Sequence, residues 1–96
     1  MIAIPKKINL PLGKVVATPE ALAVITKSGQ SPAEFLDRHS KGDWGEVDGG
    51  DWELNDQAIE EGSRILSAYR TKTNVRIWII TEWNRSSTCL LLPEEY

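Results

Sequence analysis

The sequence has few of the residues that build covalent cross-links and metal centres. Of its 96 residues one is a cysteine, Cys89, and one is a histidine, His39. A single cysteine excludes an intramolecular disulfide, and these two residues cannot by themselves form a zinc site. A glycine-rich phosphate loop is missing too, because Gly49-Gly50 follows no predicted strand and precedes no lysine. We therefore expect neither a metal nor a cofactor.

Long apolar runs are also missing. No segment reaches the length of about 20 apolar residues that a membrane-spanning helix needs. Residues 1–10 lack the apolar centre of a secretion signal. We expect a cytoplasmic protein with no membrane partner.

Basic residues are missing from the middle of the chain. Residues 42–62 contain eight acids and no base, whereas residues 63–85 contain five bases and one acid. The net charge of −3 disfavours a nucleic-acid partner, since such proteins usually carry a basic face. The acidic stretch suits either a basic partner or the basic residues of the same chain, and the sequence leaves both open.

The length and the apolar content of 41% are sufficient for one core. Residues 1–12, with Pro5 and Pro11, indicate an extended N-terminal lead-in, and residues 13–96 form the predicted domain. Residues 13–17 are a short apolar run and a candidate strand.

Three helix starts are marked by capping residues. Thr18-Pro19 and Ser31-Pro32 each place a hydroxyl at the N-cap and a proline at the first helical position. We expect helices that end near Ser28 and Gly42, with Glu34 completing a capping box and pairing with Arg38. A third helix begins between residues 48 and 51 and ends at residue 62.

The pattern then changes to strands over residues 64–71, 75–82 and 87–92. In the middle strand Val75, Ile77 and Ile79 lie on one face, and Arg76 and Trp78 on the other. Both faces are bulky, which predicts a central strand. The predicted fold class is α+β, with two or three short N-terminal helices followed by a three-stranded antiparallel β-meander, to which the candidate strand at residues 13–17 could add an N-terminal strand.

One cluster of residue types could support RNA cleavage from the sheet face. Glu82 would act as general base and Arg85 as a phosphate clamp, with Arg70 or Arg76 assisting. The alternative is structural, with Glu82 and Arg85 paired across a turn. His39 is expected to be half-buried and satisfied, and Cys89 to be a small buried residue.

The tryptophans suggest a binding surface. Trp44, Trp52 and Trp83 lie in or next to predicted loops, and Arg85 follows Trp83 closely. We predict these four as binding residues, because aromatic and arginine side chains dominate protein interfaces. The alternative for Trp44 is a structural role in a tight loop, where its ring covers the hairpin of the first two helices.

Four segments resemble a known family: "PLGKVVATPEAL", "SPAEFLDRHSKGDWGEV", "RILSAYRT" and "WIITEWNRSSTCLLLPEEY". The chain from about residue 11 to residue 96 is similar to plasmid-related proteins encoded by bacterial plasmids and integrative mobile elements. The resemblance implies such an origin and carries no activity with it. Members of that family usually have an aspartate two positions after "ITE". In this sequence that position is Asn84. A looser likeness, in element order only, is to barnase-like and RelE-like ribonucleases.

Together these observations favour a non-enzymatic interaction or accessory module. Its expected partner is another protein or a second copy of the chain. The alternative is a small ribonuclease toxin that acts from the sheet face.

Overall fold

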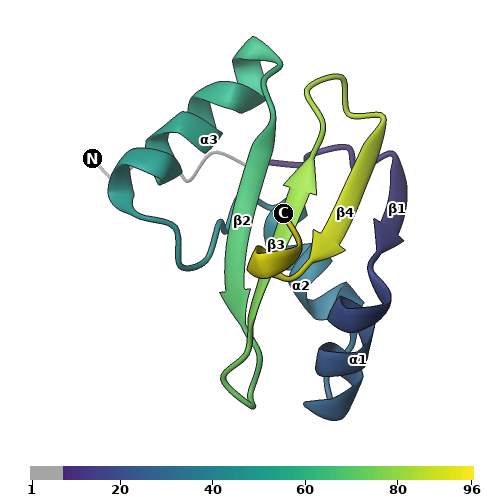
Figure 1. The fold of residues 1–96 in the computed structure, drawn as a ribbon. Helices are drawn as coiled ribbons and strands as arrows, with labels where there is room; N and C mark the ends of the chain where they lie inside the picture. Colours follow the sequence, from purple (N-terminus) through teal and green to yellow (C-terminus); the bar gives the residue numbers. More distant parts are fainter. Residues whose placement is uncertain (1–7) are drawn as a thin grey trace.

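The computed structural model describes residues 8–96, which form one mixed sheet and three α-helices (Figure 1). In chain order the elements are β1 (Lys14–Ala17), α1 (Pro19–Lys27), α2 (Pro32–Ser40), α3 (Gly49–Glu61), β2 (Ile65–Arg70), β3 (Arg76–Thr81), β4 (Ser87–Leu91) and the 3-10 helix η1 (Pro93–Glu95). Of the predicted lead-in, residues 1–7 lie outside the described part. In residues 8–12, Leu10 is buried and its amide donates to the Ser40 carbonyl at 2.8 Å.

The helices begin where the capping residues predict. Thr18 Oγ1 accepts the Ala21 amide at 3.1 Å, and Asp48 Oδ1 accepts the Asp51 amide at 2.8 Å. Each bond satisfies a helix N–H that has no partner within the helix.

The predicted interactions of Glu34 differ in the structure. Ser31 caps α2 through the Ala33 amide, whereas the Glu34 carboxylate accepts the Gln30 side-chain amide at 3.0 Å. Arg38 pairs with Asp43 at 2.7 Å, not with Glu34. The loop after α2 turns back toward the helix and presents the closer carboxylate.

The strand order is β1-β4-β3-β2. The α+β class and the order of helices before the main strands are confirmed. The sheet, however, is not a three-stranded antiparallel meander, because β1 adds a fourth strand that pairs parallel with β4. β1 leads directly into α1, which packs on β4, and this connection sets its direction.

The helices leave the two faces of the sheet unequal. In Figure 1, α1 and α2 lie behind the sheet and α3 lies beside β2, while η1 lies in front of β3. The covered face carries the main core, formed by Ala21, Ile25, Phe35, Tyr69, Ile77, Ile79, Leu90 and Leu92. A second cluster under α3 contains Leu10, Trp44, Ala58 and Ile65.

We call the opposite side the open face. It carries the alternate residues of the strands, namely Val16, Leu66, Ala68, Arg70, Arg76, Trp78, Ile80, Cys89 and Leu91. η1 covers part of it, so that Ile80 and Leu91 are buried while Ala68 and Trp78 are half-buried. None of the helices in residues 8–96 has the length and apolar character needed to cross a bilayer.

Candidate binding surface

The four predicted catalytic residues lie at opposite ends of the sheet. The β2–β3 register pairs Arg70 with Arg76 at one end and Ile65 with Thr81 at the other. Glu82 follows Thr81, so about 20 Å of extended strand separates it from Arg76. The structure therefore brings Arg70 close to Arg76 but does not bring Glu82 to either of them.

The guanidinium of Arg85 is hydrogen-bonded to backbone carbonyls at and near the end of α3. Its guanidinium donates to the carbonyl oxygens of Ala58 at 2.7 Å, Ser63 at 2.6 Å and Glu82 at 3.2 Å. The Ala58 carbonyl also accepts the backbone amides of Gly62 and Ser63, so Arg85 adds a charged donor at the end of α3 and links it to the β3–β4 turn. Partial burial lowers the pKa of Arg85 from its ordinary value. Arg85 thus contacts the backbone carbonyl of Glu82 and not its carboxylate. Its hydrogen bonds link the β3–β4 turn to the end of α3.

Asn84 supports the same turn, because its Oδ1 accepts the Ser86 amide at 3.1 Å. An aspartate, the residue usual in the resembling family, could accept this bond equally well. Asparagine and aspartate therefore stabilise the turn at position 84 in the same way.

The three predicted binding tryptophans have different surroundings. Trp44 is fully buried, and its indole nitrogen donates to Asp56 at 2.9 Å. Trp52 is half-buried against the cluster under α3, and Trp83 is 64% exposed in the β3–β4 turn. Of the three, Trp83 alone presents most of its ring to solvent, and Trp44 has no surface to offer a partner.

His39 lies at the centre of a buried chain of hydrogen bonds. Its Nδ1 is 2.5 Å from Ser67 Oγ, and its Nε2 is 2.8 Å from Thr81 Oγ1. Thr81 contacts Thr88 at 2.7 Å, and Thr88 donates to the Leu12 carbonyl at 2.8 Å. Each hydroxyl has one proton, so the bond to Leu12 fixes the direction of the others. The Thr88 proton goes to the Leu12 carbonyl, and Thr81 must therefore donate to Thr88. Thr81 then accepts from His39 Nε2–H, and the unprotonated Nδ1 accepts from Ser67.

This environment keeps the imidazole neutral. His39 is fully buried, more deeply than the sequence predicted. Burial, with a smaller effect of the Arg85 charge, lowers the pKa of His39 to about 4. The ring has no access to a substrate, so its role is to hold α2 against β2 and β3.

The remaining candidate for reactive chemistry is Cys89, which is half-buried on the open face. Burial, assisted by the charge of Glu95, raises the pKa of this thiol. A raised pKa leaves little thiolate, the nucleophilic form. Among residues 8–96 no group of three or more histidine, cysteine or acidic side chains could hold a metal ion.

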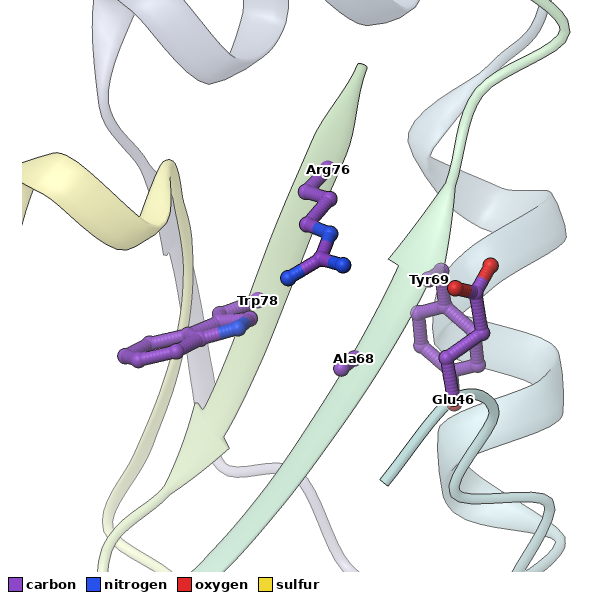
Figure 2. A pocket seen from close by; sticks show the side chains of 5 residues that line it. All are labelled: Glu46, Ala68, Tyr69, Arg76 and Trp78. Atoms are coloured by element: carbon purple, nitrogen blue, oxygen red, sulfur yellow. The ribbon is translucent and has the colours of Figure 1, made fainter. Parts of the chain in front are cut away.

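A small hollow opens on the uncovered side of β2 and β3 (Figure 2). It has a volume of about 60 Å³ and is lined by Glu46, Ala68, Tyr69, Arg76 and Trp78. Figure 2 shows the Arg76 guanidinium between the Trp78 ring on one side and Tyr69 and Glu46 on the other. The short side chain of Ala68 leaves the space between them open.

Glu46 reaches this hollow because the preceding loop lies directly against β2. Gly45 forms a parallel bridge with Ala68, and the Glu46 amide donates to the Ala68 carbonyl at 2.6 Å. Gly45 has a φ of 74°, and a Cβ at this position would collide with the Ala68 carbonyl oxygen. Only glycine allows both the conformation and the close approach.

Arg76 differs from the other arginines in what its guanidinium contacts. Arg38 pairs with Asp43, and Arg70 donates to both carboxylate oxygens of Glu46 at 3.0 and 3.2 Å. Arg64 donates to the Tyr96 hydroxyl, and Arg85 caps α3. Within the described residues, Arg76 is the arginine whose guanidinium has no hydrogen-bonded acceptor.

A larger hollow, about 290 Å³ in volume, lies between α3 and the open face of β2. Its lining residues are Val47, Asp51, Leu54, Asn55, Arg64 and Leu66. Leu54 is 61% exposed, which leaves an apolar wall accessible. Leu66 and Ala68 are two residues apart on one strand face, so the two hollows adjoin at a spacing of about 7 Å.

Sequence reasoning did not select Trp78, Arg64 or Tyr96 for this surface. Trp78 packs edge-on to Tyr96, with ring centres 5.7 Å apart, and Arg64 lies 5.3 Å from the Tyr96 ring centre. The alternation that places Arg76 and Trp78 opposite the core was visible in the sequence. This alternation predicts a central strand with both sides partly covered, and η1 does cover part of the open face.

Comparisons with known proteins return no match among family models, curated proteins or solved structures.

Proposed function

We propose that this protein is a non-enzymatic interaction module that binds a protein partner on the open face. The observation that supports this proposal best is the guanidinium of Arg76, which has no hydrogen-bonded acceptor among residues 8–96 and lies beside Trp78 in a hollow on an incompletely covered sheet. A planar guanidinium next to an aromatic ring is suited to bind a carboxylate while the ring packs against the partner.

The two adjoining hollows suggest the chemistry of the partner. An acidic side chain would enter the hollow at Arg76, and an apolar side chain would enter the larger hollow at Leu54 and Leu66. Alternate residues of an extended chain are about 7 Å apart, which matches the spacing of the hollows. The proposed ligand is therefore an extended segment with an acid and an apolar residue two positions apart.

The surrounding charges favour a protein over a nucleic acid. Six acids and no base lie between residues 48 and 61, over α3 and its N-cap. Glu46 adds a carboxylate to the hollow itself. A polyanionic backbone would be repelled along this side, whereas a single carboxylate at Arg76 would meet mainly the guanidinium.

The test is affinity purification of the tagged wild-type protein, Arg76→Glu and a matched charge reversal, Lys27→Glu. Lys27 is exposed on α1, which covers the opposite side of the sheet. We expect a protein that the wild type and Lys27→Glu retain and that Arg76→Glu loses. With purified components the loss should be at least about tenfold in affinity, equivalent to ~1.4 kcal/mol.

A charge swap then checks the contact itself, since replacing the partner's acid by lysine should restore binding to Arg76→Glu. A partner that binds Arg76→Glu as well as the wild type would overturn the proposed surface. Controlled expression in a bacterial host, followed by analysis of total RNA, checks the ribonuclease alternative. RNA fragments that accompany growth arrest would replace the binding proposal with an enzymatic one.

A further inference from the structure

The two edge strands of the sheet, β2 and β1, differ in whether their outward-facing backbone groups are hydrogen-bonded. At the β2 edge, Asn55 donates from Nδ2 to the Leu66 carbonyl at 2.8 Å and accepts the Leu66 amide on Oδ1 at 3.3 Å. The Ala68 amide donates to the Trp44 carbonyl at 3.1 Å, and the Ala68 carbonyl accepts the Glu46 amide. The outward backbone groups of Leu66 and Ala68 are thus all satisfied, which prevents another strand from adding there.

The β1 edge is not sealed in this way. The amides of Lys14 and Thr18 donate to the carbonyls of Ser86 and Leu90, each at 3.0 Å, so even-numbered residues of β1 face β4. The backbone groups of Val15 and Ala17 consequently point away from the sheet. No hydrogen bond from another of the residues 8–96 reaches them, and Figure 1 shows β1 at the rim of the sheet.

The side chains at this edge are apolar and accessible. Val15 is 45% exposed and Val16 is 41% exposed. Unpaired backbone groups beside exposed β-branched side chains are the features on which strand addition depends.

We propose that β1 pairs antiparallel with β1 of a second copy, across a two-fold axis at Val16. Val15 of each copy then lies opposite Ala17 of the other, and these residues exchange four backbone hydrogen bonds. The two Val16 side chains form a close non-hydrogen-bonded pair on the open face. The two sheets become one sheet of eight strands, and the two open faces lie on the same side.

The charges are compatible with this self-pairing. A short edge strand with a lysine is a common device against association, because like charges would meet across the new pair. In the proposed register Lys14 lies opposite Thr18 of the other copy, so the two lysines do not face each other. The acidic helix α3 flanks β2, and the two copies of α3 would therefore lie at opposite ends of the joined sheet.

The interface is small. Four residues from each copy bury less than the ~1,200 Å² typical of stable complexes, so we expect a dimer that dissociates in the range of about 10 μM to 1 mM. Sedimentation velocity of the full chain across this range measures the oligomeric state. Wild-type protein should shift from monomer to dimer as its concentration rises.

Charge variants at the axis test the register. Val16→Lys and Val16→Glu should each be monomeric at every concentration, because like charges meet at the two-fold axis. An equimolar mixture of the two should dimerise again. Thermal unfolding of each variant verifies that it is folded, and Gln57→Lys is the charge control, since Gln57 is exposed on α3 and lines neither hollow.

Three results would overturn the proposal. One is wild-type protein that stays monomeric throughout the concentration range. This result would mean that β1 pairs with a strand of another protein or with no strand. Another is a dimer that persists in Val16→Lys. The third is a dimer that Gln57→Lys abolishes, because that result would place the contact near α3.

Discussion

His39 Nδ1 accepts a hydrogen bond from Ser67 Oγ at 2.5 Å in the centre of the core. The direction of this bond follows from the chain that ends at the Leu12 carbonyl, and it requires an imidazole protonated only at Nε2. A second proton on the ring would force the Ser67 hydroxyl to change from donor to acceptor, and it would place a charge in a buried site where the described residues offer no carboxylate contact. The neutral histidine is thus a condition of this packing.

The first prediction concerns pH. The pKa of His39 is lowered from 6.5 to about 4, so the unfolded chain takes up its proton first as the pH falls. The stability that His39 contributes is complete above pH 6.5 and is lost between pH 6.5 and pH 4. The loss should reach about 3 kcal/mol at 1.36 kcal/mol per pH unit.

Urea unfolding of the wild type and His39→Gln from pH 7 to pH 4 measures this effect. The carboxylates titrate in both proteins, so the difference between the two curves reports on the histidine. His39→Gln should be less stable at pH 7 but should lose less stability on acidification. Parallel curves would show that His39 does not titrate in this way.

The second prediction separates two arginines. Arg85→Ala removes donors from the Ala58 and Ser63 carbonyls at the end of α3, so it should lower the free energy of unfolding by about 1.5–3 kcal/mol. Arg76→Ala, which breaks no hydrogen bond, should stay within about 0.5 kcal/mol of the wild type. Chemical denaturation compares the two, and equal losses would contradict the assigned role of Arg85.

The third prediction concerns the sealed edge. Asn55→Leu leaves the Leu66 amide and carbonyl without their partners, which should cost about 1–3 kcal/mol. Amide hydrogen exchange at Leu66 should become faster. The control is Gln57→Leu, an exposed position on the same helix, for which the exchange at Leu66 should not change. Unchanged exchange in Asn55→Leu would mean that the carboxamide does not protect this strand.

The fourth prediction compares two glycines. Gly45→Ala should destabilise the protein by at least about 2 kcal/mol, because φ is 74° and the new Cβ meets the Ala68 carbonyl. Gly49→Ala lies at the start of α3 with no atom within 4 Å of the new Cβ, so it should be neutral or stabilising by up to about 1 kcal/mol. Thermal melting of the pair gives the comparison, and a tolerated Gly45→Ala would contradict the close approach.

The features predicted correctly from the sequence are the local ones. Thr18, Ser31 and Asp48 mark helix starts because the atoms involved in each cap lie within three residues of one another. The alternation of Val75, Ile77 and Ile79 against Arg76 and Trp78 identifies the central strand because its period of two is a property of the strand itself.

The features that were missed depend on distant residues. The direction of β1 is decided by β4 and α1, and the burial of Trp44 depends on Asp56 and the cluster under α3. Arg85 was a candidate phosphate clamp and a predicted binding residue, but its guanidinium contacts the carbonyls of residues 58 and 63, which local spacing does not bring near. That the Arg76 guanidinium has no acceptor within the described part of the chain could be recognised only once the partners of the other arginines were known.

The parallel pairing of β1 and β4 also affects how the chain folds. Lys14 pairs with Ser87, which is 73 positions further along, whereas Arg70 and Arg76 of the β2–β3 hairpin are six positions apart. Closing the longer loop costs more chain entropy, so the hairpins should form early and β1 should join last. Substitutions in β1 would then mainly accelerate unfolding and leave the rate of folding nearly unchanged.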